Sequence, residues 1–192
     1  MTITTVAPGV GGTGLTAPGT AGNVLTSNGT AWTSTAPAAG GKVLQVVSTI
    51  KTDTFTMASG TYADITGLSV DITPASSSNR ILVFASVNHV GTTLTSASGI
   101  RLVRNSTAIA VGAAAGSRIQ TSGGAAYGNY GVTLTNETVH FVDSPATTSS
   151  TTYKIQIRVY GSTAYVNRSQ VDSDDQAYYR GASTITVMEI AA

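Results

Sequence analysis

The sequence predicts an all-β protein: an antiparallel β-sandwich of the jelly-roll type, preceded by an extended N-terminal arm. Three observations lead to this prediction. From Lys42 onward, β-branched and aromatic residues alternate with polar residues at a period of two, as strands require. Clusters of Gly, Pro, Asn, Asp and Ser separate these runs at short intervals, which is typical of sandwiches and barrels. No stretch of helical length has the 3.6-residue period of an amphipathic helix.

Residues 1–41 are the predicted arm, which is rich in Gly, Thr and Pro and carries no charged residue and no histidine. The pattern A-P-G-x-x-G-x-x-L-T occurs twice in succession, at 7–16 and 17–26. Proline excludes a continuous helix, and ordering the backbone costs about 1–2 kcal/mol per residue. The few large apolar side chains cannot offset that cost, so we expect the arm to be ordered by partners. Its expected anchoring residues are Leu15, Leu25 and Trp32, the last being the best single anchor.

Residues 42–192 are the predicted β-sandwich domain. The clearest alternation covers 153–160, where Tyr153 and every second residue after it are apolar and the intervening residues are polar. The range 80–90 is largely apolar, which predicts a strand suited to burial on both faces. Further strands are expected at 43–49, 52–57, 68–72, 100–104, 108–111, 131–135, 138–142, 163–168 and 184–188.

Composition excludes several classes of protein. Charged residues make up 10% of the chain and the net charge is +1, which argues against a partner that is nucleic acid or a membrane surface. The absence of cysteine excludes disulfides and thiolate metal sites. The apolar stretches are too short to span a bilayer. Residues 1–6 lack the basic and apolar parts of a signal peptide, so we expect no export by the secretory route.

No catalytic or cofactor site is predicted. The two histidines, His89 and His140, lie in predicted strands. We interpret each as a structural residue with one ring nitrogen in a hydrogen bond. No G-x-S-x-G elbow marks a nucleophile. Residues 9–14 match G-x-G-x-x-G, but a dinucleotide site needs a buried strand before this motif and a helix after it. We therefore expect no enzyme, no cofactor and no bound metal.

An acidic and aromatic segment near the C-terminus contains the candidate surface-recognition residues Asp174, Tyr178, Tyr179 and Arg180. The carboxylates of residues 172–175 could bind calcium or hydrolyse a glycoside, and a tyrosine pair beside arginine could stack on a sugar. Two simpler interpretations remain open. The acidic stretch could be a solvated loop, and the tyrosines could face a neighbouring subunit.

Both ends of the chain resemble the tail-fibre and related virion-fibre proteins of tailed bacteriophages. The segments that carry this resemblance are GGTGLT at 11–16, GNVLTSNGTAWT at 22–33, SPATTS at 144–149, YKIQ at 153–156 and ASTITVMEI at 182–190. The resemblance implies a non-enzymatic, homotrimeric virion component whose domain is a tumour-necrosis-factor-like jelly roll. Such fibres usually have a long shaft, which this chain lacks.

The resemblance leads to a functional expectation. The protein is expected to be a short trimeric fibre or spike in the virion, assembled in the bacterial cytoplasm. Residues 1–41 would bind tail or capsid proteins, and the β-domain would face outward and contribute to attachment to a host glycan or receptor. One alternative is a capsid decoration (cement) protein or head fibre that stabilises the shell. Another is a spike that binds or cleaves carbohydrate.

Overall fold

The computed structural model describes residues 14–15, 19–37, 41–91, 97–126 and 131–192. The chain divides into two compact units, Met1–Gly40 and Gly41–Ala192, which we describe separately. All regular structure in the described ranges is β-strand. The described part of the chain accordingly contains no helix of the length and apolar character that crossing a membrane requires.

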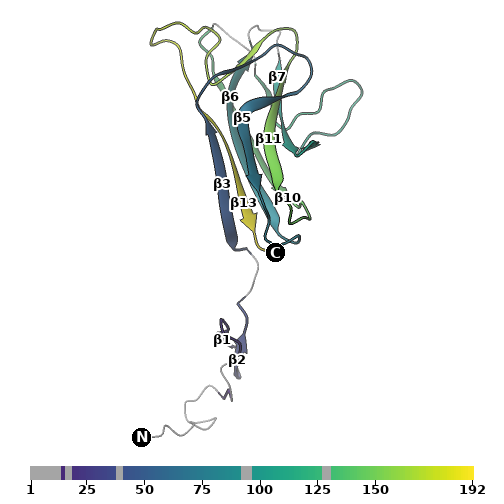
Figure 1. Ribbon diagram of the computed structural model, residues 1–192, viewed down its shortest axis with the longest axis vertical. Coiled ribbons are helices and arrows are strands. Elements are labelled where there is room, and N and C mark those ends of the chain that lie inside the picture. Colours follow the sequence, from purple (N-terminus) through teal and green to yellow (C-terminus); the bar gives the residue numbers. More distant parts are fainter. Residues whose placement is uncertain (1–13, 16–18, 38–40, 92–96, 127–130) are drawn as a thin grey trace. The chain divides into compact units, whose positions relative to one another are not determined.

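The first unit contains a short β-hairpin, with β1 at Val24–Ser27 and β2 at Trp32–Thr35 (Figure 1). The turn is built by Asn28, whose side-chain oxygen accepts hydrogen bonds from the backbone N–H groups of Thr30 and Ala31, at 2.9 and 2.8 Å. Gly29 supplies the positive φ of 86° that the turn needs. The prediction of an extended arm is therefore wrong for this stretch. Asn-Gly is a turn signal that outweighs the surrounding glycine-rich sequence.

The second unit is an antiparallel β-sandwich, as predicted, and resembles a jelly roll. In its first sheet, β6 is central, because Ser86 pairs with Thr184 of β13 on one side and Thr138 of β10 on the other. Strand β3 pairs with the far side of β13 (Figure 1). The short strands β12 and β4 extend the sheet beyond β6. The strands are β3 Val43–Lys51, β4 Phe55–Met57, β6 Arg80–Gly91, β10 Thr135–Asp143, β12 Ala164–Val166 and β13 Ser183–Ile190.

The second sheet has the order β5-β11-β7-β8, and β9 also pairs with β7. Its strands are β5 Ala63–Ile72, β7 Ser98–Arg104, β8 Thr107–Ile109, β9 Ala125–Ala126 and β11 Thr151–Val159. The two sheets enclose one hydrophobic core. The alternation predicted for 153–160 is confirmed, because Tyr153, Ile155, Ile157 and Val159 are buried in that core while the intervening residues are not.

Two strand predictions are corrected. The predicted strand at 131–135 does not form, since only Thr135 is in a strand and Gly131 has a φ of 72°, which suits a turn. Strand β6 was expected to be buried on both faces, but in a single chain this holds only for its last residues, His89–Gly91, and only one face is buried over 81–88. Val83 is fully covered, whereas its neighbour Phe84 is 36% exposed. On the second face, Leu82 and Phe84 are therefore only partly covered by the described residues of the second unit.

A buried carboxylate joins the two sheets near the C-terminus. Glu189 of β13 is covered from solvent, and its Oε1 accepts hydrogen bonds from Asn79 Nδ2 at 2.6 Å and the Ala75 N–H at 2.7 Å. Its Oε2 accepts one from Gln45 Nε2 at 2.6 Å. Burial alone would raise the pKa of Glu189, but the hydrogen bonds from these groups outweigh burial and lower it. The ionised carboxylate thus ties β3 and β13 to the segment between β5 and β6.

We expect Glu189→Gln to lower the free energy of unfolding at pH 7 by about 2–4 kcal/mol, because the new amide presents N–H donors to groups that themselves donate. The contribution of Glu189 is complete above its unfolded-state pKa of about 4.3 and is lost as the pH falls towards the lower folded-state pKa. Urea unfolding across pH 3–7 measures both effects. The control is Asp175→Asn, in an exposed loop. Equal stability of Glu189→Gln and wild type at pH 7 would contradict the assignment.

Candidate functional site

One exposed feature of the second unit is the outer surface of its first sheet. The pairing registers place Val46, Met188, Leu82 and Val142 in one row across four strands. The next two rows have the same outward orientation. We call the twelve residues of these rows the apolar sheet face: Val46, Ser48, Ile50, Leu82, Phe84, Ser86, Thr138, His140, Val142, Thr184, Thr186 and Met188.

This face carries no Asp, Glu, Lys or Arg and exposes large side chains. Ile50 is 63% exposed, Val46 55% and Val142 51%. The Phe84 and His140 rings meet edge to face with centroids 5.1 Å apart. Six of its twelve residues are apolar and the other six are Ser, Thr or His. Exposed groups of large apolar side chains on proteins often mark interaction surfaces. Sequence analysis could not assemble this face, although the apolar character of 80–90 was one signal of it.

The hairpin of the first unit brings two of the three expected anchoring residues together. Leu25 pairs with Ser34, and Ser27 pairs with Trp32, so Leu25 and Trp32 share one face of the hairpin. Each of these two side chains is 46% exposed. Leu15 is half-buried and lies outside the hairpin.

The opposite face of the hairpin is hydroxylic. Thr26 Oγ1 lies 3.1 Å from Thr33 Oγ1 and 2.9 Å from Thr35 Oγ1. This face also carries Val24, which is 44% exposed, so it is hydroxylic at three of its four positions. The other face presents the two largest side chains of the hairpin, Leu25 and Trp32, and is the one better suited to an apolar partner. A two-stranded hairpin of this size is only marginally stable by itself, so a partner against the apolar face would stabilise it.

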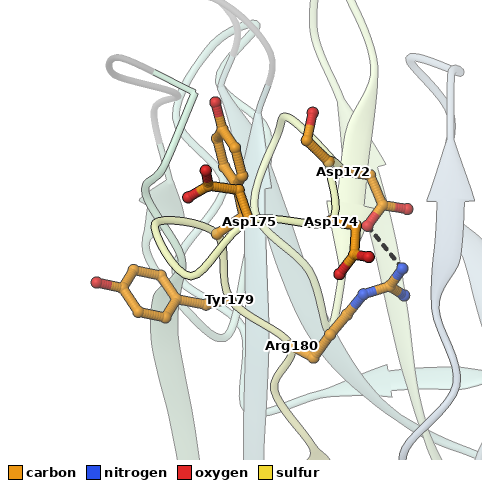
Figure 2. A pocket seen from close by; sticks show the side chains of 7 residues that line it. Asp172, Asp174, Asp175, Tyr179 and Arg180 are labelled. Atoms are coloured by element: carbon orange, nitrogen blue, oxygen red, sulfur yellow. Dashed lines mark ion pairs between the residues drawn. The ribbon is translucent and has the colours of Figure 1, made fainter.

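The predicted recognition residues Asp174, Tyr178, Tyr179 and Arg180 all line one surface pocket of about 300 Å³, in the loop between β12 and β13. Figure 2 shows that the side chains of Asp172 and Asp174 lie towards Arg180, whereas those of Asp175 and Tyr179 point away. The pocket thus keeps Asp172 and Asp174 on one side, beside Arg180, and places Asp175 on the other.

Sequence analysis missed the role of Asp172 in this pocket. Its Oδ1 is 2.6 Å from Arg180 Nη2, and its Oδ2 is 4.0 Å from Arg168 Nε. The guanidinium of Arg168 in turn lies over the Tyr165 ring, 3.5 Å from its centroid. Asp172 therefore holds the loop closed. Within the ranges described above, no three His, Cys, Asp or Glu side chains are arranged to hold a metal ion.

The histidines have the structural positions that the sequence predicted. His89 is fully buried between the sheets, with Nδ1 3.0 Å from Ser98 Oγ and no hydrogen-bond partner at Nε2 among the described residues. Burial lowers the pKa of His89 to about 4, so its ring is neutral at pH 7. Ser98 is buried as well, so this Ser-His pair is closed to substrate. His140 lies on the apolar sheet face.

The sequence matches no protein-family model and no curated protein. Solved structures to which this chain is similar include that of infectious bursal disease virus, Gt strain, at 12% identity and a TM-score of 0.44, covering 88% of this chain and 42% of that chain. Another is the VP2 subviral particle of the same virus, at 12% identity and a TM-score of 0.43, covering 88% and 37%. The chain spans about two-fifths of the length of these proteins. Identities and TM-scores at this level assign no family.

Proposed function

We propose that this protein is a structural component of a virus particle, and specifically a short homotrimeric fibre or spike of a tailed bacteriophage. The resemblance of both chain ends to phage fibre proteins supports the bacteriophage assignment. In this proposal the first unit binds other virion proteins of the tail or capsid. The β-sandwich faces outward and contributes to host attachment.

The apolar sheet face is the observation that carries the proposal of self-association. Burying apolar surface contributes about 25 cal/mol per Å². The face offers several half-exposed large side chains with no charge to desolvate, so a second copy can cover it at little electrostatic cost. Strand β6 has the apolar sequence of a strand covered on both sides, and a neighbouring copy would provide the missing cover.

A closed, rotationally symmetric assembly suits this face, because closure leaves no copy of the face exposed. The face includes β3, which begins at Val43, only two residues after the first unit ends. If copies associate in parallel through β3, the points at which β3 begins would therefore lie close together in the assembly. The proposal that the assembly has three copies rests on the resemblance to phage fibres.

The oligomeric state tests this proposal. We expect the full chain and residues 42–192 both to sediment as trimers, because the apolar sheet face belongs wholly to the second unit. Sedimentation velocity with multi-angle light scattering measures the mass directly. A clean monomer for residues 42–192 at micromolar concentration would contradict self-association through this face.

A capsid decoration protein or head fibre is the second candidate. The apolar face of the hairpin, with Leu25 and Trp32, would suit insertion between shell subunits as well as docking at a tail. The two candidates differ in the position and copy number of the protein on the particle. A particle image at modest resolution distinguishes a single tail site from a repeated capsid site.

The proposed role is structural and not catalytic. We expect the full chain to release no reducing sugar from host polysaccharide, and Asp174→Ala to leave this baseline unchanged. The reason is that Asp172 is neutralised by Arg180 and the remaining loop carboxylates diverge (Figure 2). Polysaccharide cleavage that Asp174→Ala abolishes would overturn this part of the proposal and favour a carbohydrate-cleaving spike.

A further inference from the structure

A basic pocket of about 490 Å³ lies on the outer surface of the second sheet, the side of the sandwich away from the apolar sheet face. Three arginines from three different segments meet there. Arg101 comes from β7, Arg158 from β11 and Arg118 from the loop after β8. The complete lining is Gly60, Thr61, Tyr62, Arg101, Arg118, Ile119, Gln120 and Arg158.

Two of these arginines are held in place through their Nε atoms. Arg101 Nε donates to Gln156 Oε1 at 2.8 Å, and the guanidinium lies over the Tyr62 ring, 4.1 Å from its centroid. Arg158 Nε donates to the Gly60 carbonyl oxygen at 2.8 Å. A guanidinium fixed in this way keeps its terminal N–H groups in a defined orientation. Planar, oriented guanidinium groups are the side chains best suited to binding an anion with two oxygens.

The pocket contains no carboxylate to neutralise its charge. None of its three arginines forms an ion pair within the described ranges, in contrast to Arg104 and Arg180. The acidic residue on the neighbouring strand is Asp64, which accepts hydrogen bonds from Lys154 at 2.8 Å and Gln156 at 2.7 Å. Asp64 is paired with Lys154, and it also interacts electrostatically with Arg101, so it offsets part of the charge of the pocket. Three arginines against this one shared carboxylate still leave an excess of positive charge.

A smaller, more apolar pocket of about 140 Å³ adjoins the basic one. The two pockets share Tyr62, Ile119 and Arg158. Tyr160, which is 69% exposed, lines the smaller pocket. The Tyr62 hydroxyl donates to the Gln120 carbonyl oxygen at 3.0 Å and thereby fixes the loop that carries Arg118. The result is a shallow site with an anion-binding end and an aromatic end.

We propose that these two pockets together bind an anionic sugar. The acid group of a carboxylated or sulfated glycan residue would lie on the arginines, and the sugar ring would pack against Tyr160, because Arg101 already covers one face of Tyr62. A pyranose ring has an apolar face that aromatic side chains cover, and its acid group is the complement of a guanidinium cluster. The inference deepens the proposed attachment role and rests on it for its biological meaning. Because the site is on the second sheet, assembly through the apolar sheet face leaves it open.

Titration of the full chain with small sugars tests the inference, using isothermal calorimetry and saturation-transfer NMR. The ligands are the methyl glycosides of sialic acid and glucuronic acid, galactose 6-sulfate, neutral methyl galactoside and inorganic sulfate. We expect at least one acidic sugar to bind with a Kd of about 1 mM or tighter, and the neutral sugar and sulfate alone to bind at least tenfold more weakly. The comparison of carboxylated with sulfated sugars identifies the acid group that the site prefers.

Variants locate the binding. Arg158→Gln and Arg101→Gln should each lower the affinity for the acidic sugar at least tenfold. Arg118→Gln, in an exposed loop, provides a third test that leaves both sheets intact. Arg80→Gln, exposed on the first sheet, is the matched control and should bind like wild type. Thermal unfolding confirms that each variant is folded.

Three outcomes would overturn the inference: equal binding of neutral and acidic sugars, binding of sulfate alone as tight as that of the sugars, or unchanged affinity in all three pocket variants. Absence of sugar binding in a protein that still forms trimers would refute the proposed sugar site but would not contradict the proposed structural role. Conversely, a monomer that binds acidic sugars would support the site and contradict self-association.

Discussion

Phe84→Glu is expected to convert the trimer to folded monomers. Phe84 lies at the centre of the apolar sheet face and is 36% exposed in the single chain, so a glutamate there remains in water when the protein is monomeric. Assembly would bury that charge against uncharged side chains. Burying an unpaired charge costs several kcal/mol, and every copy in the assembly carries one. Each 1.4 kcal/mol lowers the association constant tenfold, so the expected loss is at least a thousandfold.

Sedimentation velocity across a range of concentrations measures this loss, and thermal unfolding reports whether the monomer is folded. The matched control is Ser69→Glu, an exposed position of β5 on the outer surface of the second sheet, which should remain trimeric. A Phe84→Glu protein that stays trimeric would show that another surface makes the contacts. A wild-type monomer would refute self-association altogether.

Deletion of residues 1–41 is expected to abolish incorporation into the particle while the β-sandwich still folds. The hydrophobic core is formed by residues of the second unit, so the thermal midpoint of residues 42–192 should stay close to that of the full chain. The uncharged first unit offers apolar side chains to partners. Comparing the amounts of wild-type and truncated protein in purified particles measures the effect.

Within the first unit, Trp32→Ala should weaken docking more than any other single change, by about 2 kcal/mol or more, as for buried tryptophans at other interfaces. Leu25→Ala should have the next largest effect, because both side chains lie on one face of the hairpin. Thr33→Ala, on the hydroxylic face, is the control and should be incorporated almost normally. Normal incorporation of the truncated protein, or its failure to fold, would contradict the division into an anchoring unit and an independent domain.

The alternation of residues along each strand determined much of the fold. In 153–160 the side chain at every second position is apolar, and successive side chains of a strand point to opposite faces, so the buried face could be read directly. The same argument placed 184–188 correctly within β13. It failed at 131–135, where Val132 and Leu134 do alternate with threonines but the chain turns at Gly131, whose φ is 72°, and only Thr135 enters a strand.

Local turn chemistry was also available in the sequence but was overlooked in the first unit. The hairpin depends on contacts between Asn28 and residues two and three positions later, which the segment Asn28-Gly29 could have indicated. The loop pocket was partly predictable for a similar reason. Asp174, Tyr178, Tyr179 and Arg180 are close in sequence, whereas the ion pair of Asp172 with Arg180 required the folded loop.

The sequence by itself determined the all-β class, most strands and the side chains that enter the core, because these follow from local periodicity and turns. Only the tertiary structure decided which strands are neighbours, and hence which distant residues share a surface. Val46, Leu82 and Val142 form one apolar row, and Arg101, Arg118 and Arg158 form one pocket, although each set is dispersed along the chain. Strand pairing depends on the free energy of the whole core, and no single segment carries that information.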